Sequence, residues 1–173
     1  MKSSITNRFI NPSTSALAFA MIALSLPAAA QTGTWTGTGA GPNNWSASAQ
    51  WSGGTVANGA SNTVNFSSDI TQLTVVTVDS NRTIGSMRFS DNAVSGSPWL
   101  LRGTSTVTMD NGASPAVIAK TTATTISAPI SGSNIRINGG SSLNLIGNNT
   151  GITGTLTLNG INGIAIGNSN AFG

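Results

Sequence analysis

Apolar and polar residues alternate with a period of two along most of the chain after residue 62. Side chains that alternate in this way lie on opposite faces of a β-strand. Gly, Asn, Asp or Ser separate the alternating runs and favour turns. The pattern predicts short strands at 63–66, 73–79, 83–89, 99–103, 105–110, 116–119, 125–130, 135–137, 142–146 and 155–158.

The spacing of these strands limits the architecture. Strand centres arrive about every ten residues, as in a β-sandwich, a barrel or a β-solenoid. Segments 139–148 and 151–160 both join a Gly-rich turn to a Leu-polar-Leu core, and such weak internal repetition is typical of stacked units. We therefore predict an all-β fold built as a β-solenoid, with a β-sandwich as the alternative.

The segment from Trp35 to Phe66 differs from the rest of the chain. It places Trp35, Trp45 and Trp51 between clusters of turn-forming Gly, Pro and Asn residues. A solenoid needs an atypical terminal unit to cover its first coil, and large aromatic side chains can close a β core. We interpret this segment as an N-terminal cap. The alternative is a glycan-binding platform that stacks sugars on Trp45, Trp51 or Trp99.

Residues 1–30 have the pattern of a secretory signal peptide. Lys2 and Arg8 lie in a polar start, an apolar run covers 16–26, and small residues at 28–30 suit cleavage after Ala30. The run of about eleven residues is shorter than the roughly twenty that span a bilayer. The expected organisation is a signal peptide at 1–30, a Trp-rich cap at 31–66 and solenoid coils at 67–173.

Charge and cysteine content narrow the possible partners. Without the leader, five basic and four acidic residues remain, so the net charge is 5 − 4 = +1. A nucleic-acid surface needs clustered Lys and Arg, and the cations here are scattered, so we expect no nucleic-acid partner. The chain has no cysteine, so its stability rests on burial and hydrogen bonding. The charged residues are Arg82, Arg88, Arg102, Lys120, Arg136, Asp69, Asp79, Asp91 and Asp110.

The chain offers few side chains for catalysis. It has no His, no Cys and no Glu, and its four Asp residues fit turns between strands. Nucleophilic triads therefore lack their base, and no pair of carboxylates lies close in sequence. The Gly- and Asp-containing nine-residue calcium repeat is absent from the sequence. We predict no catalytic, cofactor-binding or metal-binding residue.

Four segments carry a resemblance to a known family. They are NNWSASAQWSGGTVANGASNTVNF at 43–66, LTVVTVDSNRTIGSMRF at 73–89, WLLRGTSTVTM at 99–109 and GITGTLTLNGINGIAIGNSNAFG at 151–173. Together they resemble the start of bacterial autotransporter-type passenger proteins with the autotransporter-associated β-strand repeat. The resemblance implies a right-handed parallel β-helix exposed outside the cell. With one clear repeat-like unit, at 151–160, and no C-terminal barrel in the sequence, we expect an N-terminal fragment.

These observations lead to a functional expectation. The chain is expected to be an exported cell-surface passenger or stalk with an adhesive role and no catalysis, meeting surface glycans or a host or neighbouring cell. A membrane would be reached only through a C-terminal region absent from this chain. The alternatives are a glycan-binding module and the non-catalytic N-terminal part of a polysaccharide-degrading β-helix enzyme. Edge-to-edge self-association is also expected, through Leu156, Leu158, Ile164 and Ile166.

Overall fold

The fold is built from β-strands stacked in parallel. The computed structural model describes residues 31–92 and 95–172, so the predicted signal peptide lies outside the described residues. Besides strands, the described part contains two single-turn 3₁₀-helices, η1 (Ser48–Gln50) and η2 (Ser52–Gly54), and no α-helix. The all-β prediction is confirmed.

Twelve strands form two sheets. The larger sheet contains β1 (Gly33–Trp35), β2 (Gly59–Phe66), β4 (Arg82–Phe89), β6 (Val107–Met109), β7 (Ala116–Lys120), β9 (Ile130–Asn138) and β11 (Gly151–Asn159). The second contains β3 (Thr74–Thr77), β5 (Trp99–Arg102), β8 (Thr124–Ile126), β10 (Ser142–Leu145) and β12 (Gly163–Ile166). The strands pair in parallel within each sheet.

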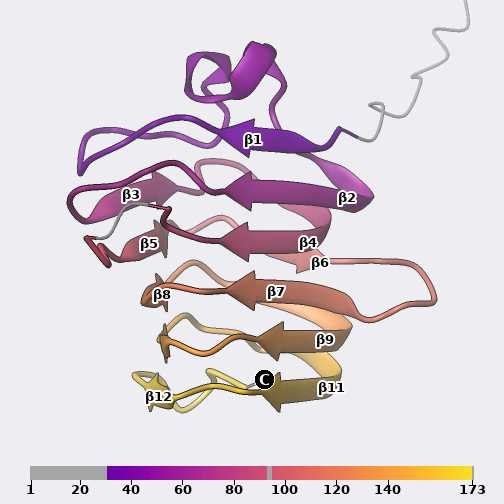
Figure 1. The fold of residues 1–173 in the computed structure, drawn as a ribbon. Coiled ribbons are helices and arrows are strands. Elements are labelled where there is room, and N and C mark those ends of the chain that lie inside the picture. The colour runs from indigo at the N-terminus through magenta and orange to yellow at the C-terminus, as the bar shows by residue number, and fades with distance from the viewer. Residues whose placement is uncertain (1–30, 93–94, 173) are drawn as a thin grey trace, which may run out of the picture.

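The chain passes from one sheet to the other at each half-turn and descends by one strand with each full turn. Figure 1 shows this winding as a right-handed coil that runs from β1 to β12. In a β-sandwich the strands pair mainly antiparallel, whereas here successive strands of one sheet pair in parallel and come from successive turns. The prediction of a right-handed parallel β-solenoid is therefore confirmed, and the alternative of a β-sandwich is wrong.

The register explains how each coil is covered. In the second sheet, one inward-facing residue of each coil pairs in register with the corresponding residue of the preceding coil. These residues form a column through the stack. Each apolar side chain in such a column loses its water only when the next coil is in place. The column consists of Val76, Leu101, Ile126, Leu145 and Ile166.

The two similar Gly- and Leu-containing segments do not stack on each other. Leu143 and Leu145 lie in β10 of the second sheet, whereas Leu156 and Leu158 lie in β11 of the larger sheet. In the register, Leu143 pairs with Ile164 and Leu156 pairs with Ile135. The repetition therefore marks two consecutive half-turns, one in each sheet, of the stacked solenoid.

An aromatic cluster fills the N-terminal end of the core. Phe66 stacks on Phe89 with ring centroids 4.9 Å apart and an interplanar angle of 20°. Trp35 and Trp51 meet edge to face at 5.1 Å, and Trp45 meets Phe66 edge to face at 5.4 Å. All five rings are buried, so this end of the solenoid is closed by aromatic packing.

Residues 36–58 form the cap that covers the first coil. Trp51 bridges Trp35 of β1 antiparallel, Asn58 bridges Gln31 just before β1 antiparallel, and Asn44 bridges Thr77 at the end of β3 in parallel. Ser46 donates its N–H and its hydroxyl hydrogen to the Asp79 carboxylate. Strands β1 and β2, which lie within the segment 31–66, belong to the larger sheet.

Phe66 touches most of this cluster, so its truncation should loosen both the cap and the first coils. We expect Phe66→Ala to lower the free energy of unfolding by about 3–5 kcal/mol, the usual cost of a large core cavity. Leu73→Ala, at a side chain that is 42% exposed, should change it by no more than about 0.5 kcal/mol. Urea unfolding followed by circular dichroism measures both. Equal effects of the two substitutions would contradict the packing described.

Candidate functional site

The tryptophans predicted as a glycan platform lie inside the core. Trp45 and Trp99 are 0% exposed and Trp51 is 3% exposed. Their indole N–H groups donate to backbone carbonyls: Trp45 to Ala57 at 3.0 Å, Trp51 to Trp45 at 2.7 Å and Trp99 to Ser90 at 2.9 Å. Stacking on a sugar needs an exposed ring face, and these three rings present none. Trp45 and Trp51 instead pack between the cap and the first coil.

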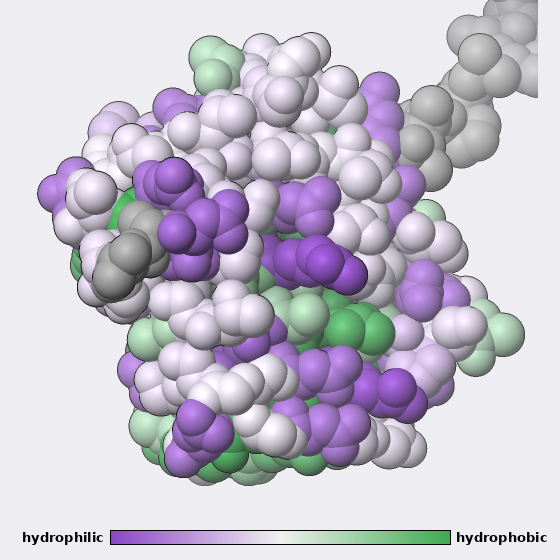
Figure 2. Space-filling view, in the orientation of Figure 1, coloured by the Kyte–Doolittle hydropathy of each residue, from purple (hydrophilic) through white to green (hydrophobic). Residues whose placement is uncertain are grey.

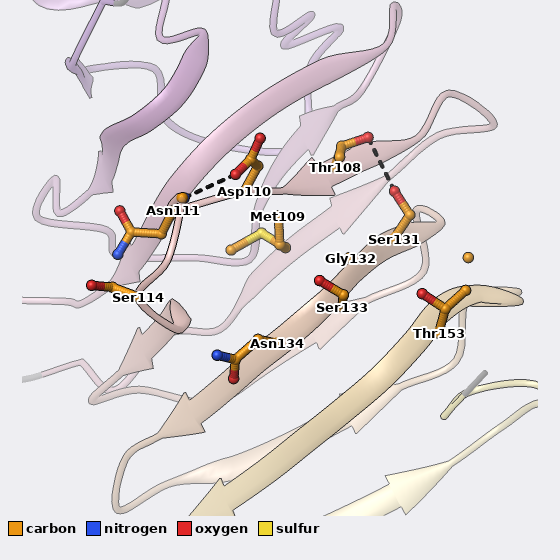
Figure 3. Close-up of a pocket in the computed structure, with 12 residues that line it drawn as sticks. Thr108, Met109, Asp110, Asn111, Ser114, Ser131, Gly132, Ser133, Asn134 and Thr153 are labelled. Carbon is orange, nitrogen blue, oxygen red and sulfur yellow. Dashed lines mark hydrogen bonds between the residues drawn. The ribbon is translucent and has the colours of Figure 1, made fainter.

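A groove lies on the surface where the larger sheet is interrupted. It encloses about 450 Å³ beside the loop at 110–115 that joins β6 to β7. Figure 3 shows its lining residues arriving from three successive coils, with Thr108 and Asp110 above, Ser131 to Asn134 in the middle and Thr153 below. We call it the corner groove.

The register explains why the corner groove exists. Strand β9 pairs with β6 at Ile130 and Ser131, and pairing resumes with β7 at Ile135. Between these points the loop at 110–115 leaves the sheet, so the described residues Gly132–Asn134 have no register partner on that side. Because these register pairs are missing, a gap opens between two coils, and polar side chains line it.

The loop above the groove is held in place by hydrogen bonds. The N–H of Asp110 donates to the carbonyl of Ile84 at 2.8 Å, and the carbonyl of Asp110 accepts from the N–H of Ser61 at 2.9 Å. Within the loop, the Asn111 amide donates to the Pro115 carbonyl at 3.1 Å. The groove therefore has a preformed wall, which lowers the entropy cost of binding.

The floor of the groove requires a glycine. Gly132 has φ +146°, a left-handed conformation that side chains rarely adopt, and a Cβ added there would lie 2.6 Å from the Met109 carbonyl oxygen. Any larger residue would push β9 away from β6. The sequence predicts only a turn between the strands at 125–130 and 135–137. The contact between Gly132 and Met109 forms only when the coils are stacked in register.

Hydrogen-bonding groups line the corner groove. Hydroxyl and amide groups from Ser133, Asn134 and Thr153 line it, and the hydroxyls of Ser131 and Thr108 are joined at 3.0 Å. Its one carboxylate, Asp110, accepts the N–H of Gly112 at 2.9 Å. Acid–base cleavage of a glycosidic bond usually takes two carboxyl groups, so this arrangement suits binding of a neutral, polar ligand.

A buried lysine lies in the core below the aromatic cluster. Lys120 is 1% exposed and occupies the column of Trp35, Phe66 and Phe89 in the register. Its ammonium donates to the Ser141 carbonyl. Gly139 makes room for it: φ there is +143°, and a Cβ would lie 1.9 Å from the Lys120 carbonyl oxygen. Desolvation by burial lowers the pKa of Lys120 below its ordinary value of 10.5.

Comparisons with protein-family models, curated proteins and solved structures found no match. The resemblance to autotransporter passengers therefore stays a prediction. Within 31–92 and 95–172, no group of three or more His, Cys, Asp or Glu side chains could hold a metal ion. No helix in the described part of the chain is long and apolar enough to cross a membrane.

The lowered pKa of Lys120 makes a testable link between pH and stability. Because the unfolded lysine binds its proton more tightly, the free energy of unfolding should rise with pH from the folded pKa up to 10.5. The chain has no His, Cys or Tyr to titrate in this range. Urea unfolding between pH 7 and 10.5 should show the rise in the wild type and its loss in Lys120→Met.

Arg136→Met serves as the control, since it removes a positive charge from an exposed side chain. This variant should keep the alkaline rise in stability. A rise that persists in Lys120→Met would show that another group causes it.

Proposed function

We propose that the chain is an exported structural passenger or stalk, displayed at the outer surface of a bacterial cell, of the type that carries the autotransporter-associated β-strand repeat. It holds a surface-exposed region away from the cell and contributes no catalysis. The observation that carries this proposal is the uninterrupted column of inward residues from Val76 to Ile166 through parallel strands. Such a scaffold extends along one axis by adding coils.

Composition supports the same function. The chain contains no cysteine and is only 6% charged. A repetitive stack held by backbone hydrogen bonds does not depend on the redox state of its surroundings. The leader-like pattern at 1–30 supplies the export route, and Ala28 to Ala30 provide the small residues that a signal peptidase requires.

Export can be tested by following the N-terminus of the protein in the producing bacterium. The protein recovered from outside the cytoplasm should begin at Gln31. Replacement of Ala30 by Arg should block cleavage and leave the precursor, whereas Ala40→Arg, at an exposed position of the cap, should leave processing unchanged. An antibody against the solenoid should label intact cells. Labelling confined to lysed cells would contradict display at the surface.

A second function, binding of a neutral glycan, is favoured by the corner groove. Its hydroxyl and amide lining matches the hydrogen-bonding groups of sugars, and its wall is preformed by the loop at 110–115. This proposal moves the glycan site from the buried tryptophans to Asn134, Ser133 and Thr153. It is compatible with the stalk function, because the groove lies on the outer surface of the coils.

An array of neutral and acidic oligosaccharides tests this site directly. We expect the purified chain to bind neutral sugars, and each neutral hydrogen bond lost in Asn134→Ala or Thr153→Ala to weaken binding by about 0.5–1.5 kcal/mol. Asn144→Ala is the matched control, since Asn144 is an exposed asparagine of β10 in the other sheet. Absence of binding, or equal loss in the control, would remove the glycan function and leave the stalk proposal untouched.

A further inference from the structure

The stacking of the coils brings two cations that are far apart in the chain onto one face of the larger sheet. Arg88 of β4 and Arg136 of β9 are exposed, and the residues on either side of each in its strand are buried. Because side chains alternate along a strand, both arginines point outward from the sheet. Strand β7 lies between β4 and β9 and pairs with both of them.

The surface between the two arginines is apolar and shallow. Arg88 pairs in register with Ala119, and Val117, two residues earlier in β7, pairs with Arg136. Figure 2 shows apolar surface between strongly hydrophilic side chains over the middle of the molecule, where Figure 1 places β4, β7 and β9. With strands about 4.8 Å apart and residues about 3.3 Å apart along each strand, the two arginine Cα atoms are separated by about 12 Å. We call the surface formed by these four residues the arginine face.

A hollow of about 250 Å³ opens in the arginine face next to Arg88. Ala119 lies between Arg88 and Asn138 in the register. Because Ala119 has only a methyl group, space remains between the side chains of the two longer residues. Phe89 also lines the hollow. The hollow therefore combines the donors of a guanidinium and an amide with apolar atoms of Ala119 and Phe89.

The electrostatic field at the hollow favours an anion. Lys120 also lines the hollow, and its buried ammonium donates to an uncharged acceptor, the Ser141 carbonyl. Among the described residues the one salt bridge joins Arg82 to Asp79, so neither Lys120 nor the arginine face has a carboxylate partner there. The four Asp residues of the chain all lie outside the strands. A buried charge without a counter-charge attracts an anion strongly, because the protein interior screens it little.

We propose that the arginine face binds an acidic polysaccharide, a chain of sugars that carry carboxylates. An arginine presents paired N–H donors that match the two oxygens of a carboxylate, so the two arginines hold two carboxylates of one chain. One carboxylate occupies the hollow at Arg88, within the field of Lys120. The C–H groups of the sugar rings pack on Val117 and Ala119, and a sugar hydroxyl reaches the Asn138 amide.

A polysaccharide fits this face better than a nucleic acid does. Nucleic-acid binding relies on many cations along the phosphate backbone and on exposed aromatic rings for stacking. The arginine face has two arginines, and the ring of Phe89 in its hollow is 1% exposed. The site is also separate from the corner groove, which neither arginine lines. The inference goes beyond both proposed functions and does not depend on export or on neutral glycan binding.

Isothermal titration calorimetry of the purified chain with an oligomer of galacturonic acid tests the site. The matched control ligand is the same oligomer with its carboxylates methyl-esterified, which keeps the sugars and removes the charge. We expect the ester to bind at least about tenfold more weakly than the acid, because it loses the charged hydrogen bonds. Binding of the acid should also weaken as the salt concentration rises.

Substitutions on the arginine face test its residues. Arg88→Met and Arg136→Met should each weaken binding of the acidic oligomer about tenfold or more, since each removes a charged hydrogen-bonding group. Arg102→Met is the matched control, because it removes the same charge from an exposed arginine of β5 in the other sheet; it should leave binding unchanged. Ala119→Leu fills the hollow without a change of charge and should also weaken binding. Circular dichroism verifies that each variant is folded.

Several results would overturn the arginine face as a polysaccharide site. They are no binding of the acidic oligomer, equal binding of the acid and the ester, and an equal loss of binding in Arg102→Met. Tighter binding of a single-stranded DNA oligonucleotide, lost in Arg88→Met, would show that the face takes phosphate polymers instead. These outcomes leave the corner groove untouched, because Asn134→Ala and neutral sugars test it separately.

Discussion

The structure depends on one constraint: a single coil of this chain cannot bury its own apolar side chains or pair its own strand edges. Both needs are met by the neighbouring coil. The column through Val76, Leu101 and Ile126 shows this, because Leu101 lies between the other two in the register and is 0% exposed. The first coil of such a stack has no preceding coil, so another structure must cover it.

The packing of the core changes from the first coil to the last described coil. At the N-terminal end the cap bridges β1 through Trp51, and Trp45 and Trp51 of the cap pack on Phe66. Farther along the same column the rings give way to Lys120, whose long apolar stem continues the packing while its ammonium reaches the Ser141 carbonyl. In the last described coil, Ile164 and Ile166 of β12 are 39% and 43% exposed.

Interruptions of the stack create the features that a regular solenoid lacks. Where the loop at 110–115 leaves the larger sheet, β9 loses three register partners and the corner groove opens. The regular coils below and above hold this gap at a fixed width. A rigid scaffold with a local polar gap is a suitable setting for binding, because the groove exists before any ligand arrives.

The sequence alone predicted the strands well, since a period of two is a local property that each segment carries by itself. It predicted the solenoid and the capping role of Trp35, Trp45 and Trp51 from the same local evidence. It did not predict β1, which lies in a stretch rich in turn residues, or the corner groove, or the burial of Trp99 against Phe89.

These features depend on the register between coils, which joins residues far apart in the chain. Gly132 meets Met109, and Gly139 meets Lys120, only after the coils are stacked. The sequence by itself determined most of the strands and the alternation that gives them an apolar face. The tertiary structure alone decided that the tryptophan rings are buried and where the larger sheet opens, because both depend on contacts between coils.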